Sequence, residues 1–162
     1  MTEVKEALMI FRPELEGIVQ ADIKAFTENM LAAAPAVFYQ NKETVSHTKR
    51  VFKLVNELLN REGTGGPYRD MMLTAVLLSD ISENSLPEDL RYIHPLAAAK
   101  TIRDLGKDMI NGQMLDALAQ MIESHEGPSS PSKRMEPPMG TPGFVIALAN
   151  QIVRFEFISI EV

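Results

Sequence analysis

The sequence predicts an all-α fold, and three observations support this prediction. Apolar residues recur at helical spacing in one segment after another, which is the pattern of amphipathic helices. No Gly-rich phosphate loop and no alternation of strand, turn and helix is present, so a Rossmann or P-loop fold is not expected. Ten methionines, few aromatic residues and no tryptophan suit helix packing with flexible side chains filling gaps. The 162 residues are a single-domain length, and we expect one helical bundle over 1–162.

The first two predicted helices lie in the N-terminal half of the chain. Helix 14–33 is rich in helix formers, and Pro13 occupies a favourable first helical position. Helix 44–61 carries a single apolar stripe along its length. The sequence Gly-Thr-Gly-Gly-Pro at 63–67 breaks the helical pattern after it.

The next three predicted helices form the middle of the chain. Helix 68–81 is apolar on nearly all sides, so we expect it at the centre of the bundle. Helix 95–105 follows, and Gly106 is placed as its C-terminal stop. Helix 112–124 has one inward apolar face.

The last third of the chain combines a loop with one more helix. Residues 127–142 contain five prolines and are predicted to form a loop, either a lid over a cleft or a solvated connection. Helix 144–157 is apolar on most sides. The tail 158–162 is predicted to be a short extended piece or a fraying helix end.

Charge and composition restrict the partners that this chain can have. Its net charge is −6, so long duplex DNA or RNA is not expected, although 49–53 and 100–107 are locally basic. Without cysteine, the chain has no disulfides, thiolate nucleophile or Cys-ligated zinc. The N-terminus lacks signal-peptide architecture, and no apolar run reaches membrane-spanning length. We therefore expect a cytoplasmic, soluble protein without a membrane segment.

A few polar residues occupy positions that should face the interior. His47, Asp80 and His125 each lie at helical spacing from apolar residues. A buried carboxylate near imidazoles is costly unless something satisfies it, and a metal ion is one such partner. The alternative is that each is a core polar group with an ordinary hydrogen-bond partner. His94 precedes Pro95 and can equally be the first residue of a helix.

Five motifs in the same order resemble those of the HD-domain superfamily. They include an opening His motif, a His-Asp motif, a His-Pro segment, a Ser-His-x-Gly form common in small phage-encoded members, and a closing helix. The resemblance covers about 44–157. In chain order the motifs are Ser46–Val51, Thr74–Ile81, Tyr92–Ala98, Ile122–Gly127 and Val145–Ile152.

The resemblance implies an HD-domain-like helical bundle, with N-terminal helices in 1–40 and a core over 44–157, and metal-dependent phosphohydrolase activity. Substrates in the superfamily include nucleotides, cyclic dinucleotides, dinucleoside polyphosphates and nucleic-acid ends. The expected ligand is thus a nucleotide or another small phosphate compound. One divalent transition metal, Mn, Fe, Ni or Zn, is implied as the cofactor. In the family, the first His, the His-Asp pair and the last Asp hold a first metal, and in two-metal members the Asp also bridges to a second ion held by the two later histidines. Carried over residue by residue, the metal ligands implied for this chain are His47, Asp80, His94 and His125.

The chain departs from the family pattern at the residues that carry the chemistry. The His of the His-Asp pair is Ser79, and the last Asp is Asn150. A hydroxyl is a poor ligand for a transition metal and an amide offers only a neutral oxygen, so both are weakened ligands. Asp80, His94 and His125 can still form a two-His, one-carboxylate set with open positions.

Two hypotheses on function follow from this mixture of kept and lost residues. In the first, an active phosphohydrolase uses Asp80 to hold the metal that activates water, and Arg50 steadies the phosphate. Arg50 can equally pair with a carboxylate for structural reasons. In the second, the protein is catalytically inactive and binds a nucleotide or a protein. His47, Asp80 and Asn150 then merely hydrogen-bond to one another, and the metal is absent.

The sequence also suggests where a homo-oligomer could form. Met71, Met72 and Met109 are expected to be exposed and to offer an apolar, adaptable contact surface. Nothing in the sequence specifies the number of subunits.

Overall fold

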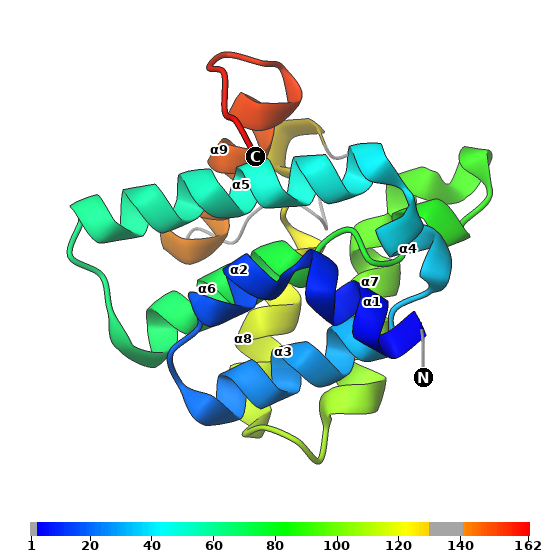
Figure 1. Ribbon diagram of the computed structural model, residues 1–162, viewed down its shortest axis with the longest axis horizontal. Coiled ribbons are helices and arrows are strands. Elements are labelled where there is room, and N and C mark those ends of the chain that lie inside the picture. Colours follow the sequence, from blue (N-terminus) through cyan, green and yellow to red (C-terminus); the bar gives the residue numbers. More distant parts are fainter. Residues whose placement is uncertain (1–2, 130–140) are drawn as a thin grey trace.

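The computed structural model describes residues 3–129 and 141–162, and every regular element in these ranges is a helix (Figure 1). This confirms the all-α prediction. Within the same ranges, no helix is both long and apolar enough to cross a bilayer. The α-helices are α1 (Glu3–Ile10), α2 (Arg12–Glu16), α3 (Ala21–Ala33), α4 (Ala36–Gln40), α5 (Lys42–Arg61), α6 (Gly66–Leu78), α7 (His94–Gly106), α8 (Gly112–Glu123) and α9 (Thr141–Arg154); the 3₁₀ turns are η1 (Glu83–Ser85), η2 (Glu88–Ile93) and η3 (Gly127–Ser129).

The apolar helix α6 lies at the centre of the bundle, as predicted. Its residues 70–78 are all buried, and it packs against α3, α5 and α8. Figure 1 shows α5 lying along the long axis of the molecule, with α1 to α3 on one side of it, and α9 crosses and packs against α5. Leu73 and Leu77 are fully buried, and burial of each such side chain stabilises the fold by about 1.5–3 kcal/mol.

The prediction of one continuous helix over 14–33 is wrong. The chain turns between α2 and α3, and the carboxylate of Asp70 on α6 accepts the backbone N–H groups of Val19 (3.1 Å) and Gln20 (2.6 Å). This buried acceptor satisfies donors that would otherwise be orphaned where α3 begins. Because Asp70 is distant in sequence, helix propensity alone did not reveal the break. Residues 3–40 hold the four helices α1 to α4.

The boundaries of the middle helices explain how the later site residues are placed. Helix α5 begins after Asn41, whose side chain accepts the backbone N–H of Thr44 at 3.0 Å. Helix α6 ends at Leu78, earlier than the predicted 81, so Asp80 lies in the turn that follows it.

Helices α7 and α8 match their predicted ranges within about two residues, as is usual for helix ends. Gly106 is the last residue of α7 and is buried against α3. A Cβ at this position would lie 2.6 Å from Cε2 of Phe26, so glycine permits close helix packing here. Asn111 caps α8 by accepting the backbone N–H groups of Gln113 and Met114.

The C-terminal helix is shorter than predicted at its far end. It ends at Arg154 rather than at 157, and the last residues fold back along α5. The backbone carbonyl of Ile160 accepts from Arg50, and that of Glu161 accepts from Lys53. Of the predicted loop 127–142, residues 127–129 form η3 and Thr141 already belongs to α9, while 130–140 lie outside the described residues.

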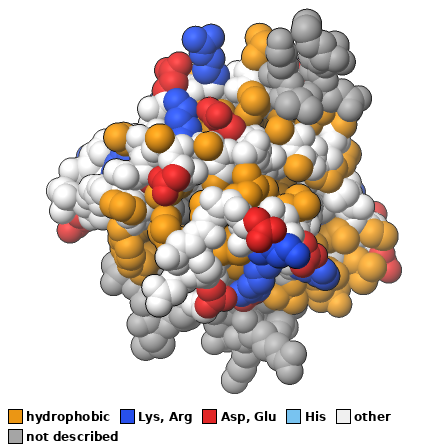
Figure 2. All heavy atoms as spheres, turned by 90° about the horizontal axis from the view of Figure 1, so that it is seen from below, with side chains coloured by type: hydrophobic (Ala, Val, Ile, Leu, Met, Phe, Trp, Pro, Cys, Tyr) orange, Lys and Arg blue, Asp and Glu red, His pale blue; other side chains and the backbone are white. Residues whose placement is uncertain are grey.

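The predicted exposed methionine surface is wrong, because two of its members belong to the central helix. Met71 and Met72 are 9% and 2% exposed, and Met109 alone is 38% exposed. The basic stretch 100–107 is partly neutralised, since Lys100 and Arg103 pair with neighbouring acidic side chains. On the face in Figure 2, Lys and Arg side chains lie beside Asp and Glu side chains, among scattered apolar ones.

Candidate metal centre

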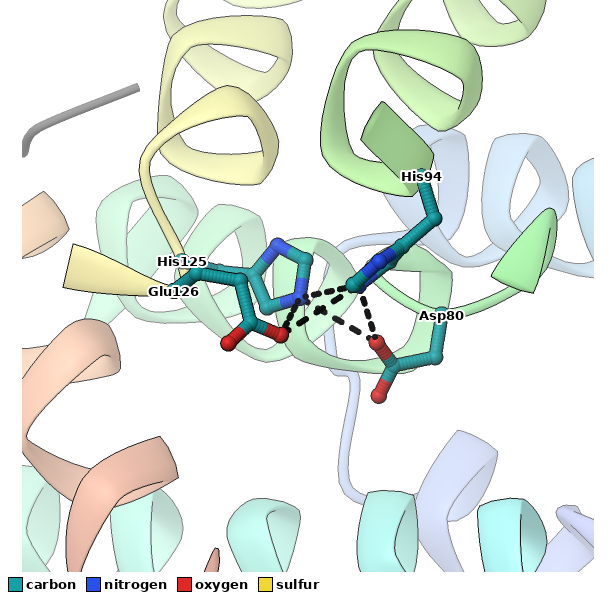
Figure 3. A group of neighbouring side chains, drawn as sticks. All are labelled: Asp80, His94, His125 and Glu126. Atoms are coloured by element: carbon teal, nitrogen blue, oxygen red, sulfur yellow. Dashed lines mark hydrogen bonds and ion pairs between the residues drawn. The ribbon is translucent and has the colours of Figure 1, made fainter. Parts of the chain in front are cut away.

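Four polar side chains from three separate segments of the chain converge inside the bundle (Figure 3). Asp80 follows α6, His94 is the first residue of α7, and His125 and Glu126 lie in the turn after α8. They are between 1% and 5% exposed. Each offers one ligand atom, and the four atoms all lie within 4.8 Å of one another. We call this set the four-residue centre.

The distances from the two imidazole nitrogens in the four-residue centre are compatible with ligand atoms around one metal ion, and also with hydrogen-bonded ion pairs. Oδ1 of Asp80 lies 3.1 Å from Nε2 of both His94 and His125, and the two Nε2 atoms are 3.1 Å apart. Oε1 of Glu126 lies 3.3 and 3.4 Å from these nitrogens. Metal–ligand bonds of about 2.1 Å separate neighbouring ligand atoms by about 3.0–3.4 Å, for octahedral and tetrahedral geometry respectively. The spacing therefore fits a transition-metal site.

Both imidazole rings are oriented by hydrogen bonds from their outer nitrogens. Nδ1 of His94 donates to the backbone carbonyl of Arg91, and Nδ1 of His125 donates to that of Ile122, each at 2.7 Å. These bonds leave Nε2 of each ring facing the centre. Histidine ligands of metals are held in this way in known sites, because the outer donor sets the tautomer and the ring orientation.

The charges in the four-residue centre require cations. Burial lowers the pKa of His94 and His125, but the hydrogen bonds and charges of Asp80 and Glu126 outweigh it and raise these pKa values to about 10 and about 9. Burial raises the pKa of Asp80 and of Glu126, yet the two imidazoles hold both well below their usual values. At neutral pH two imidazolium ions thus balance two carboxylates. One divalent ion with two neutral imidazoles balances the same charge.

The other sequence-predicted ligands lie outside the four-residue centre. Nε2 of His47 donates to Oδ1 of Asn150 at 2.6 Å and lies 4.0 Å from Oδ2 of Asp80. The amide nitrogen of Asn150 donates to the backbone carbonyl of His125 at 3.1 Å, which fixes its oxygen as the acceptor for His47. A protonated Nε2 has no lone pair for a metal. The hydroxyl of Ser79 is also engaged, since it donates to the carbonyl of Ala75 at 2.6 Å.

A cleft of about 430 Å³ opens beside the four-residue centre, and His94 and Glu126 belong to its wall. Two arginines, Arg91 and Arg154, also line it. The pKa of Glu83 in this wall is raised, chiefly by burial and then by the charge of Asp80. The remaining lining residues are Glu43, Thr44, His47 and Tyr92.

Arg50, the predicted phosphate-binding residue, lies at a different place. It lines a separate cleft with Glu156 and residues 158–160, and its Nε donates to the carbonyl of Ile160 at 3.1 Å. The arginines that line the cleft beside the four-residue centre are Arg91 and Arg154. The structure thus does not bring Arg50 to the other predicted site residues, and its observed contact is to the backbone of the last residues.

Glu126 is the site residue that the sequence did not reveal. It directly follows His125, and neighbouring residues on a helix point about 100° apart, so helical spacing argues against a shared site. His125 and Glu126 lie in the turn after α8 rather than on the helix, so helical spacing does not keep their side chains apart. Gly127 has φ of 53°, a left-handed conformation that glycine adopts without strain. A glycine directly after a His-Glu pair was the one available sign of such a turn.

No protein-family model, curated protein or solved structure matches this chain. The resemblance to the HD-domain superfamily therefore rests on the five sequence motifs. Since fold does not determine function, the function has to be argued from the chemistry of the four-residue centre and its cleft.

Proposed function

We propose that this protein is a phosphohydrolase that depends on one divalent transition metal, held by Asp80, His94, His125 and Glu126. Its substrate is a small phosphate ester of the nucleotide type. The observation that supports this proposal best is the position of four converging ligand atoms beside a cleft that contains two arginines.

The donor set favours a transition metal. Two imidazole nitrogens with two carboxylate oxygens suit Mn, Fe, Ni or Zn, and Mn and Fe commonly take further ligands beyond four. When bound, such an ion neutralises phosphate charge and lowers the pKa of water. Because the carbonyls of Arg91 and Ile122 accept from Nδ1, loss of the Nε2 proton from each imidazolium would leave the tautomer that the ion needs.

The chain itself contributes phosphate recognition and partial exclusion of water. Arg91 offers a planar guanidinium group, which matches phosphate oxygens in geometry and charge. Arg154 adds a positive charge to the same cleft, although its Nη1 and Nη2 bond the Glu126 carboxylate. The four-residue centre is buried, so electrostatic interactions there are stronger than in water. In the reaction a water oxygen bonds to phosphorus, the bond from phosphorus to the ester oxygen breaks, and that oxygen leaves with a proton.

A second candidate function is binding of a phosphate compound without hydrolysis. The observation that favours it is the hydrogen bond between His47 and Asn150, which occupies two residues that hold the first metal in the HD-domain pattern. In this case the four-residue centre is an ion cluster of two imidazolium groups and two carboxylates, and the cleft binds its ligand through arginine alone.

The test is elemental analysis of protein purified without chelator and then incubated with Mn, Fe, Ni or Zn salts, followed by assays of phosphate release from nucleotides and p-nitrophenyl phosphate. We expect one ion per chain, lost in His125→Gln but kept in His47→Gln. The second variant is the matched control, because His47 lies outside the four-residue centre and glutamine can still donate to Asn150. One ion without phosphate release refutes hydrolysis but leaves the metal site standing, whereas no ion with any salt refutes the proposal and favours the second candidate.

A further inference from the structure

Three side chains of helix α9 bond to the turn that contains His125 and Glu126, two of the four proposed ligands. Asn150 donates to the backbone carbonyl of His125 at 3.1 Å, and Gln151 donates to that of Glu126 at 2.9 Å. Arg154 reaches the carboxylate of Glu126 itself: Nη2 lies 2.7 Å from Oε1, and Nη1 bonds Oε2. Asn150 and Gln151 thus hold the backbone of the turn, whereas Arg154 holds the side chain of a proposed ligand.

Glu126 needs such a partner if it is to serve as a ligand. A free glutamate side chain rotates about several bonds, and fixing it costs conformational entropy. The planar fork of Arg154 contacts both oxygens at once, which leaves Oε1 facing the nitrogens of His94 and His125. The pairing also lies at the cleft wall, where the Arg154 side chain is 34% exposed.

We propose that Arg154 is the positioning residue of this metal site: it orients Glu126 so that Oε1 completes the ligand set. This inference rests on the metal site of the proposed function and adds a residue to it. It predicts an effect opposite in sign to that of a simple nearby charge. A cation close to a metal site repels the ion, so its removal should strengthen binding, whereas removal of a positioning residue weakens binding.

The experiment compares Mn²⁺ affinity, measured by calorimetry, in the wild type and in Arg154→Gln, Arg154→Lys and Arg103→Gln. We expect Arg154→Gln to weaken Mn²⁺ binding by about 10–100-fold, the usual effect of losing a group that orients a ligand. Arg154→Lys keeps the positive charge but lacks the planar guanidinium group, so the loss of Mn²⁺ affinity should be smaller than in Arg154→Gln. Arg103→Gln is the matched control, since Arg103 also pairs with a glutamate, Glu123, and is 38% exposed. Its affinity should equal that of the wild type.

A double-mutant cycle with Glu126→Gln separates positioning from a general structural role. If Arg154 acts through Glu126, Arg154→Gln should cause no further loss of Mn²⁺ affinity once Glu126 is replaced. Additive losses, unchanged affinity or stronger binding in Arg154→Gln would overturn the inference while leaving the metal site intact. A wild type that binds no metal overturns both the proposed function and this inference, so the two failures are distinguishable.

Discussion

Metal binding at the four-residue centre should release two protons. In the metal-free protein the pKa values of His94 and His125 are about 10 and about 9, so both imidazoles are protonated at neutral pH. Asp80 and Glu126 have lowered pKa values and are ionised there. An ion can use Nε2 of each ring only after its proton has left, because the lone pair is otherwise occupied.

The size of the effect follows from this proton count. Displacement of two protons makes the association constant rise about 100-fold per pH unit, or about 2.7 kcal/mol, at any pH below the lower imidazole pKa. The affinity for the metal ion therefore rises with pH. This dependence on pH disappears as pH passes through about 9 and about 10, because the imidazoles then lose their protons even without a metal.

The assay is calorimetric titration with Mn²⁺ at several pH values between about 6 and 8, in buffers that differ in ionisation enthalpy, which counts released protons. We expect two protons per ion in the wild type, and the same number in His47→Gln, since His47 lies outside the four-residue centre. Release of fewer than one proton would refute the reasoning. It would mean that the two carboxylates do not keep the imidazoles protonated.

The remaining predictions concern stability and are checked by urea denaturation. Asn150→Asp should lower the free energy of unfolding by about 1–3 kcal/mol, because the buried amide donor to the carbonyl of His125 becomes an acceptor. Asn111→Asp is its control and should not destabilise the protein, since Asn111 uses its oxygen to accept two backbone N–H groups. Gly106→Ala should cost about 1–3 kcal/mol through the close contact with Phe26, whereas Gly112→Ala, with nothing within 4 Å, should be neutral. Equal stability of Asn150→Asp and Asn111→Asp, or of the two glycine variants, would contradict these accounts.

The sequence was a good guide wherever local periodicity decides structure. An all-apolar segment can be satisfied only in the interior, so the central place of α6 followed from its composition. The same logic identified His125 and Asp80 as inward polar residues, and the order of the motifs added His94. These three are brought together by the structure.

Local patterns failed where a distant group decides the outcome. The break between α2 and α3 coincides with hydrogen bonds to Asp70, a residue of α6 that no local window contains. Arg50 was predicted either to hold phosphate or to pair with a carboxylate, and in the structure its Nε donates to the backbone carbonyl of Ile160. Both contacts depend on which elements the fold places side by side.

The four-residue centre likewise depends in part on local sequence pattern and in part on contacts that only the fold creates. By itself the sequence predicted from helical spacing that Asp80 and His125 face the interior, and both are buried, although they lie in the turns after α6 and α8 rather than on the helices. The tertiary structure alone decided the membership of the site. The turn after α8 places the side chains of His125 and Glu126 close together. Arg154 bonds the Glu126 carboxylate, and the hydrogen bond to Asn150 holds His47 outside the four-residue centre. The physical reason is that ligand geometry depends on distances of a few ångströms between atoms far apart in the chain, and only packing sets those distances.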